Sequence, residues 1–170
     1  MKKLTFLGLM LFACLCTSQQ LKAQEVQPLL EQNIVFSHNQ ENWFPPISVA
    51  VDGLTDEQAS FKGNSVDHSI AELVSHLVFW NERMLKAMKG EEVPQFDGNN
   101  DATFTAYSED DFGELAGRLD QILTGIEEVS RDLNPEQMKG WAATLANIAS
   151  HNAYHTGQMV FIRKQNGWWR

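Results

Sequence analysis

The sequence predicts an all-α protein organised as a four-helix bundle. Apolar residues recur every three to four positions along four separate stretches, which is the spacing of residues on one helix face. No stretch alternates apolar and polar residues with the period of a β-strand. The length of 170 residues suits one domain, and four amphipathic helices in one small domain are typical of a bundle.

The first helix is expected over about 26–42, with an apolar stripe formed by Leu29, Leu30, Ile34 and Phe36. Pro45 and Pro46 interrupt it, because proline lacks a backbone donor and restricts the residue before it. A shorter helical piece is expected over 46–51, and Gly53 follows its end.

The second helix has clear signals at both ends. Ser69 followed three residues later by Glu72 is a capping-box pattern, and Gly90 is a natural stop. Between them the apolar positions recur at helical spacing, at Ile70, Leu73, Leu77, Trp80, Met84 and Met88. Residues 91–107 are expected to form a long connection without a periodic pattern.

The third helix is expected to begin near Ser108, with acidic residues in its first turn. Its core stripe consists of Phe112, Leu115, Leu119, Ile122, Ile126 and Val129. Asn134 and Pro135 mark a break, and the fourth helix is expected over about 141–166. The long connection between the second and third helices permits a crossover, so loop length alone does not impose an up-down order.

The N-terminus has the pattern of a secretory signal peptide. Lys2 and Lys3 precede an apolar run over 4–15, and Ala23 offers a small residue for cleavage. The run is too short for an ordinary transmembrane helix. We therefore expect a signal peptide over 1–23, an exported (periplasmic or secreted) domain over 24–170, and no transmembrane helix in the mature chain. A lipoprotein cleavage site at Cys14 is the alternative, ranked second because Phe12 is bulky for that role.

Composition excludes several classes of function. Cleavage after residue 23 removes both cysteines, so the mature domain has neither a disulfide nor a cysteine nucleophile. The formal net charge is -9, and the removed segment contains three lysines and no acid, so the mature domain is more acidic still. Nucleic-acid binding is excluded as a function, because phosphate recognition needs clustered cations.

Three histidines form the candidate metal site. His151 and His155 are four residues apart and so share a helix face, on an inward stripe that also holds Gln158. His76 lies among core positions of the second helix. If the two helices pack together, three imidazoles converge on one divalent ion and leave coordination positions open. Gln158 and Glu72 are weaker catalytic candidates, able to orient a ligand or contact a substrate.

Less specific interpretations stay open. A lone His-x-x-x-His pair is more often incidental, whereas three inward histidines favour metal binding because burying unpaired imidazoles costs free energy. His38 follows Ile34 at helical spacing and is expected to have a structural or rim role. Asn152 stands where one metalloprotease motif has its general base, which argues against that chemistry. A non-catalytic metal- or ligand-binding bundle is the alternative function, and a plain bundle with an empty pocket is the third.

Two motifs resemble those of DinB-like (DinB/YfiT) proteins. One runs from His68 through Val74 to His76 and Trp80, and the other is the segment 151–158 with the basic pair at 163–164. The segment 53–59 also fits the region after the first helix of that family, so the resemblance covers essentially the mature chain.

This resemblance implies an up-down-down-up bundle, often dimeric, which holds nickel or zinc through the residues matching His76, His151 and His155. Some relatives transfer a low-molecular-weight thiol to an electrophile, and others are described as metal-dependent hydrolases. We therefore expect a hydrolase or a thiol S-transferase with an unknown small-molecule substrate. The signal peptide weakens the transferase alternative, because thiol cofactors are cytosolic in such relatives.

Overall fold

The structure is a computed structural model that describes residues 26–63, 66–105 and 112–169. Within these residues the regular structure is entirely helical, as the sequence predicts. An N-terminal helix occupies 26–38. The later elements are α2 (Ile47–Val51), α3 (Asp56–Ser60), α4 (Ile70–Met88), the 3-10 helix η1 (Asn100–Thr103), α5 (Phe112–Arg131) and α6 (Pro135–Gln165).

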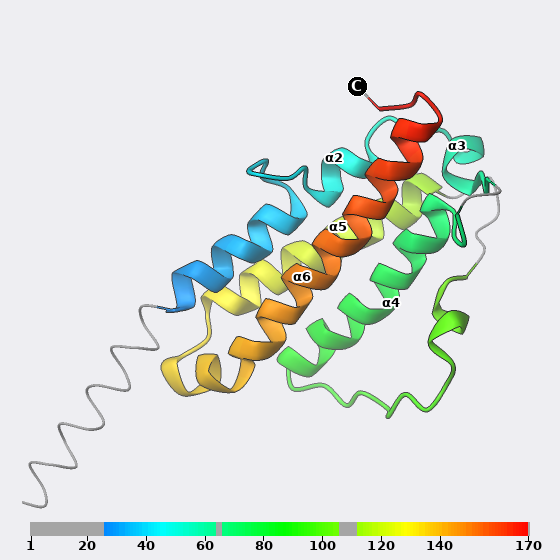
Figure 1. Ribbon diagram of the computed structural model, residues 1–170. Coiled ribbons are helices and arrows are strands. Elements are labelled where there is room, and N and C mark those ends of the chain that lie inside the picture. Colours follow the sequence, from blue (N-terminus) through cyan, green and yellow to red (C-terminus); the bar gives the residue numbers. More distant parts are fainter. Residues whose placement is uncertain (1–25, 64–65, 106–111, 170) are drawn as a thin grey trace, which may run out of the picture.

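The four long helices form a bundle with a crossover (Figure 1). The N-terminal helix and α6 run in one direction, and α4 and α5 run in the opposite direction (Figure 1). The chain must therefore travel the length of the bundle between the end of α4 and the start of α5, and η1 lies on this path. This is the up-down-down-up order that the family resemblance implies.

The start of α4 confirms the predicted capping box. The Ser69 hydroxyl accepts a hydrogen bond from the Glu72 backbone N–H at 3.2 Å, and the Glu72 carboxylate accepts one from the Ser69 N–H at 2.8 Å. Two orphan donors of the first turn are thereby satisfied. At the other end, Gly90 adopts a φ of +75°, which favours glycine as the residue that ends a helix.

The start of α6 differs from the sequence prediction. The helix begins at Pro135 rather than near residue 141, so Asn134 and Pro135 are its first signals and not a break before it. The Asn134 side chain accepts hydrogen bonds from the backbone N–H groups of Glu136 and Gln137. Proline is well tolerated there because its missing donor would have no intrahelical partner.

Smaller differences concern the other element ends. The N-terminal helix ends at 38 rather than at 42, and α3 and η1 are short helices that the sequence did not predict. The short helix expected over 46–51 is present as α2. The expected start of the third helix near Ser108 lies outside the described residues, as do the signal peptide over 1–23 and Cys14.

The core lies where the predicted stripes of the second and third helices meet. Its fully buried members include Ile70, Leu73, Leu77, Leu119 and Ile126. The stripe predicted for the first helix is wrong at Leu29, which is 61% exposed. That helix instead buries the face formed by Ile34, Ser37 and His38, which follow one another at helical spacing.

Arg163 of α6 ties the short helix α2 to the bundle. Its buried guanidinium donates to the carbonyl oxygens of Ala50 and Asp52, each at 2.9 Å, and to the carbonyl oxygen of Trp168 at 3.1 Å. Carbonyl groups at the end of a helix lack intrahelical partners, so this side chain satisfies them. Among the described helices, none combines the length and the apolar character that crossing a bilayer requires.

Candidate metal centre

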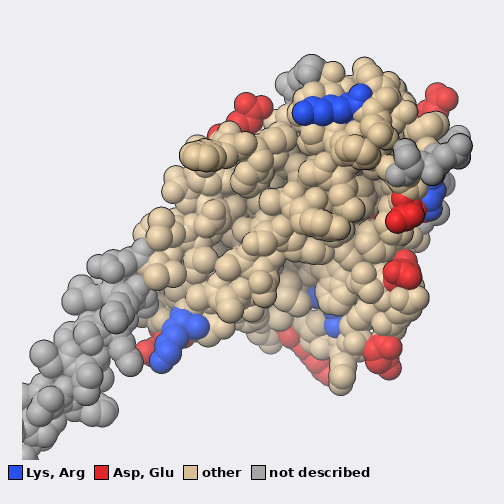
Figure 2. Space-filling view, viewed as in Figure 1, with Lys and Arg blue, Asp and Glu red and all other residues tan. Residues whose placement is uncertain are grey.

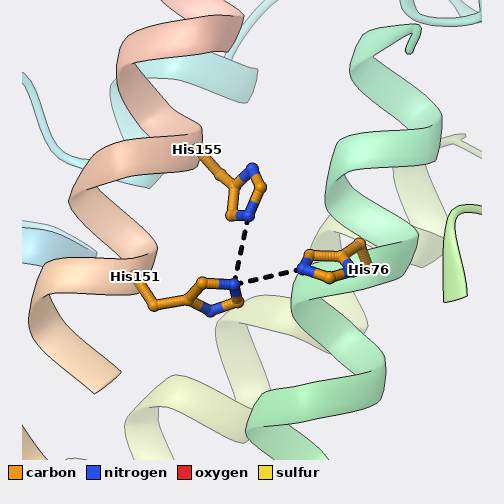
Figure 3. A group of neighbouring side chains, drawn as sticks. All are labelled: His76, His151 and His155. Carbon is orange, nitrogen blue, oxygen red and sulfur yellow. Dashed lines mark hydrogen bonds between the residues drawn. The ribbon is translucent and has the colours of Figure 1, made fainter. Parts of the chain in front are cut away.

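Three histidine side chains meet between α4 and α6. His151 and His155 extend from successive turns of α6, and His76 reaches toward them from α4 (Figure 3). The Nε2 atom of His151 lies 3.1 Å from the Nε2 atom of His76 and 3.1 Å from the Nε2 atom of His155. The structure thus brings together the three histidines that the sequence singled out.

The spacing of these nitrogens fits one divalent ion. All three lie within 4.8 Å of one another, and no other described His, Cys, Asp or Glu belongs to the group. Imidazole nitrogens bind zinc at about 2.0–2.1 Å, which places two ligands about 3.3 Å apart in a tetrahedron and about 2.9 Å apart at adjacent octahedral positions. The 3.1 Å that separates His151 Nε2 from each of the other two Nε2 atoms lies between these values.

Thr103 orients the ring of His76. The Thr103 hydroxyl donates its hydrogen to the carbonyl oxygen of Asn100 at 2.6 Å, so toward the ring it can only accept. The Nδ1 atom of His76 lies 2.5 Å from that hydroxyl oxygen and therefore carries the ring proton. The lone pair of His76 is consequently on Nε2, the atom that faces the other two histidines.

Gln158 orients the ring of His155 in the same way. The side-chain carbonyl oxygen of Gln158 lies 2.6 Å from the Nδ1 atom of His155 and accepts its hydrogen. His76 and His155 thus both present Nε2 lone pairs to the Nε2 atom of His151, which carries at most one hydrogen. One hydrogen serves one contact at a time, whereas a cation would satisfy all three nitrogens.

Burial keeps the cluster neutral. Desolvation, followed by the charges of His155, His151 and His68, lowers the pKa of His76 from 6.5 to about 3. Desolvation is also the largest cause for His155, whose pKa falls to about 4, and it lowers the pKa of His151. Uncharged imidazole is the form that binds metal, so the rings of His76 and His155 remain available as ligands well below pH 7.

Phe104 covers one side of the cluster. Its ring stacks on His76 with a centroid distance of 4.0 Å and on His68 with a distance of 3.8 Å, at an interplanar angle of 8° in both cases. Thr103 and Phe104 come from the connection after α4, for which the sequence predicted no regular structure. Sequence reasoning missed them because no periodic pattern marks that segment.

A buried amide pair holds α4 against α6 beside the histidines. The Asn81 amide donates to the side-chain oxygen of Asn152 at 2.9 Å and to the carbonyl oxygen of Leu77 at 2.8 Å. Asn152 is fully buried and contacts α4 through this pair, which is the packing role that its place on the helix, away from the face of His151 and His155, predicts. Two features of the sequence could have indicated this pair. Asn152 directly follows His151, and Asn81 lies one helical turn after the core position Leu77.

The Glu72 side chain caps the start of α4. Besides the capping bond to Ser69, its carboxylate lies 3.2 Å from the Lys62 ammonium and 3.6 Å from the Nδ1 atom of His68. It does not belong to the three-histidine group. Of the two catalytic candidates, only Gln158 contacts a histidine of the cluster.

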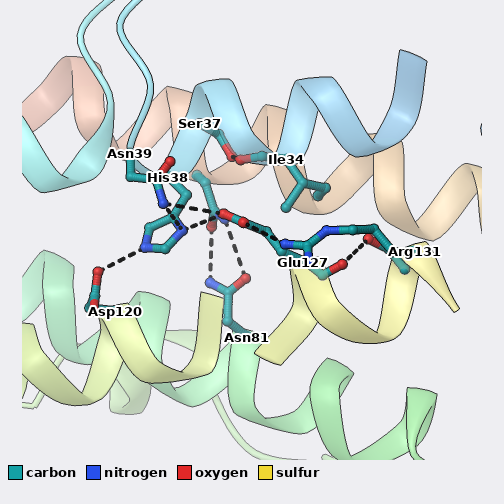
Figure 4. Close-up of polar contacts among 10 residues, drawn as sticks. Ile34, Ser37, His38, Asn39, Asn81, Asp120, Glu127 and Arg131 are labelled. Atoms are coloured by element: carbon teal, nitrogen blue, oxygen red, sulfur yellow. Dashed lines mark hydrogen bonds and ion pairs between the residues drawn. The ribbon is translucent and has the colours of Figure 1, made fainter. Parts of the chain in front are cut away.

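His38 does not belong to the three-histidine group and makes structural contacts with the residues of α5 drawn in Figure 4. Its Nδ1 atom lies 2.6 Å from Glu127 and its Nε2 atom lies 2.9 Å from Asp120, both on α5. The ring is 1% exposed and ties the N-terminal helix to α5. This agrees with the structural role expected from the sequence.

A cavity of about 1060 Å³ opens onto the three histidines. It lies between α4, η1 and α6, and Gln158 also contributes to its wall. A space of this size accepts a small organic molecule beside the histidine nitrogens. The other lining residues are Asp67, His68, Trp80, Asn81, Met84, Asn100, Asp101, Phe104, Thr144, Asn147, Ile148, Ser150 and Tyr154.

The comparisons with known proteins match the chain to one family. The family model described as the DinB superfamily matches residues 47–159, which include all three histidines and the whole of α4 and α5. No curated protein matches the chain, and no solved structure does so either.

Proposed function

The chain belongs to the DinB superfamily, and we propose that it is a metal-dependent enzyme that binds one divalent ion through His76, His151 and His155. The observation that carries this proposal is the orientation of the ring nitrogens. His76 and His155 each donate Nδ1–H to an acceptor and present Nε2 to the shared point. Such outer partners fix the tautomer of metal-binding histidines and raise their basicity.

Catalysis is favoured over a purely structural ion by the small number of protein ligands. In the described part of the chain the group has three members, and the alternatives for a fourth, His38 and Glu72, are engaged elsewhere. Structural zinc sites usually have four protein ligands, whereas catalytic sites have three and keep a position for water or substrate. The cavity supplies the space for that substrate.

When bound, a divalent ion of this kind acts as a Lewis acid and lowers the pKa of an oxygen or sulfur ligand. The residues of this chain would contribute the rest of the site. Thr103 and Gln158 hold the rings, and Phe104 excludes water from one face of His76. We infer hydrolase or thiol S-transferase chemistry, with nickel or zinc as the ion, from the family resemblance and from the preference of neutral imidazole for these metals.

Metal analysis of the purified protein tests the site. We expect close to one equivalent of nickel or zinc in the parent protein and a loss of bound metal in His76→Ala. His68→Gln is the matched control, because it removes a histidine near the cavity and leaves the three ligands in place. Retention of full metal content by His76→Ala would show that the ligands are assigned wrongly.

Screens for turnover separate an enzyme from the alternative, a non-catalytic binding bundle. Hydrolysis and thiol-transfer substrates are compared with and without a chelator, and with His76→Ala as the inactive reference. Activity that requires the metal supports the enzyme. A stoichiometric metal complex that turns over none of the substrates favours the binding module.

We also infer that the protein is exported after removal of residues 1–23, with lipidation at Cys14 as the less favoured alternative, and that it forms a homodimer. The basic start, the apolar run and the small residue at 23 support export. Sequencing the N-terminus of protein from cell fractions tests the cleavage, and light scattering tests the dimer. An uncleaved cytosolic chain would contradict the first inference, and a monomer at micromolar concentration would contradict the second.

A further inference from the structure

Apart from the histidines, the described residues of the cavity wall carry only negative charge. Its only charged side chains are the carboxylates Asp67 and Asp101, and no described lysine or arginine contributes to it. The remaining surface combines amide, hydroxyl, apolar and aromatic side chains, with Trp80, Phe104 and Tyr154 as the ring systems beside the histidines.

Two cations in the segments that precede and form α4 have partners outside the cavity wall. Lys62 pairs with Glu72. Arg83 donates to the carbonyl oxygen of Pro94 and lies against the rings of Phe79 and Phe96. On α6, no Asp, Glu, Lys or Arg occurs between Lys139 and Arg163, and the surface over this helix is largely uncharged in Figure 2.

The two carboxylates lie at the same mouth of the cavity. Asp67 precedes His68, and Asp101 lies three residues before Phe104. Because the rings of His68 and Phe104 stack at 3.8 Å, the segment before α4 and the helix η1 are held side by side. Within the described residues, neither carboxylate has an ion pair with lysine or arginine.

We propose that the ligand of this cavity is an amine-bearing small molecule, which places its donor atom at the three histidines and its ammonium group at Asp67 and Asp101. The inference rests on the proposed function for the position of the donor atom. The two carboxylates attract a cation and repel an anion. Trp80 and Tyr154 in the cavity wall add the affinity of aromatic rings for cations.

Three small thiols test the proposal, because they share one donor atom and differ in charge. Cysteamine carries an ammonium group, 2-mercaptoethanol is neutral and 3-mercaptopropionate carries a carboxylate. Their dissociation constants are measured on the cobalt-loaded full-length protein from the sulfur-to-cobalt absorption bands. We expect cysteamine to bind at least about fivefold more tightly than 3-mercaptopropionate, and the ratio to shrink as salt is added.

Variants locate the origin of the selectivity. Asp67→Asn combined with Asp101→Asn is expected to lower this ratio at least about fivefold relative to the parent protein, a comparison in which the different thiol acidities of the probes cancel, and to leave cobalt binding unchanged. Glu128→Gln combined with Asp132→Asn is the matched control, because it removes two exposed carboxylates from α5 and its end, outside the cavity. This control is expected to keep the full ratio.

The outcomes separate the two proposals. Equal affinities for the three thiols on a protein that binds cobalt would overturn the charge selectivity and leave the metal site standing. A ratio that survives in the Asp67 and Asp101 double variant would overturn the assignment to these carboxylates. Failure of the parent protein to bind cobalt at all would overturn the proposed function, and the ligand inference with it.

Discussion

The Nδ1 atom of His76 lies 2.5 Å from the hydroxyl oxygen of Thr103, a residue 27 positions further along the chain. This contact joins α4 to the crossover connection and determines which nitrogen of His76 faces the cavity. Thr103 is 4% exposed, so no bulk water competes for the bond.

Thr103→Val should therefore weaken metal binding without removing a ligand. Losing the partner of a metal-binding histidine typically lowers affinity by about 10- to 100-fold. Competition with a chromophoric chelator measures the change. Thr105→Val is the matched control, because Thr105 is exposed and only two residues away. Equal metal affinities for the two variants would show that Thr103 does not act on the site.

The amide pair between α4 and α6 should contribute to stability. Asn152→Ala leaves the buried Asn81 amide without one of its partners, which costs about 1–3 kcal/mol in the free energy of unfolding. Urea denaturation measures this change in the free energy of unfolding. Asn147→Ala, at an exposed site on the same helix, should change the free energy of unfolding by less than about 0.5 kcal/mol. Similar losses in both variants would contradict a special role for the pair.

Stability of the metal-free protein should fall as the solution is acidified. The pKa values of His76 and His155 are about 3 and about 4 in the folded state and 6.5 for the unperturbed side chain. The unfolded chain therefore binds more protons than the folded chain at intermediate pH, and stability is lost as pH falls from about 6.5 toward the folded values. Above about pH 7 these histidines contribute no pH dependence.

Denaturation at pH 7.0 and 5.5 tests this, because most carboxylates remain ionised over that interval. His76→Asn should lose less stability than the parent protein between the two pH values. Identical pH dependence in the two proteins would show that His76 is protonated as easily in the folded state as in the unfolded chain.

Metal should stabilise the fold reversibly. An ion that binds only the folded state adds about 2.7 kcal/mol when its free concentration is 100 times the dissociation constant. We expect the melting temperature to rise with added zinc or nickel and to return to its starting value with chelator. His151→Ala should abolish the response. A variant that still responds would place the ion elsewhere on the molecule.

Features that depend on a single helix could be predicted from the sequence. The stripe of α4 and the pair His151 and His155 depend only on the helical repeat, which applies to any sequence that folds as a helix. The Ser69 capping box is a similarly local pattern, complete within four residues. The start of α6 at Pro135 was missed because the same residues, asparagine and proline, are used both to begin a helix and to break one.

The sequence by itself determined the helical class, the inward placement of three histidines and the residues most suited to hold a metal, because these follow from local spacing and side-chain chemistry. Only the tertiary structure decided that Thr103 and Phe104 complete the site, that Glu72 lies outside the histidine group, and that His38 lies with Asp120 and Glu127. Those contacts join residues up to 89 positions apart. Such pairs come together when apolar faces are buried, and no local periodicity encodes which partners then meet.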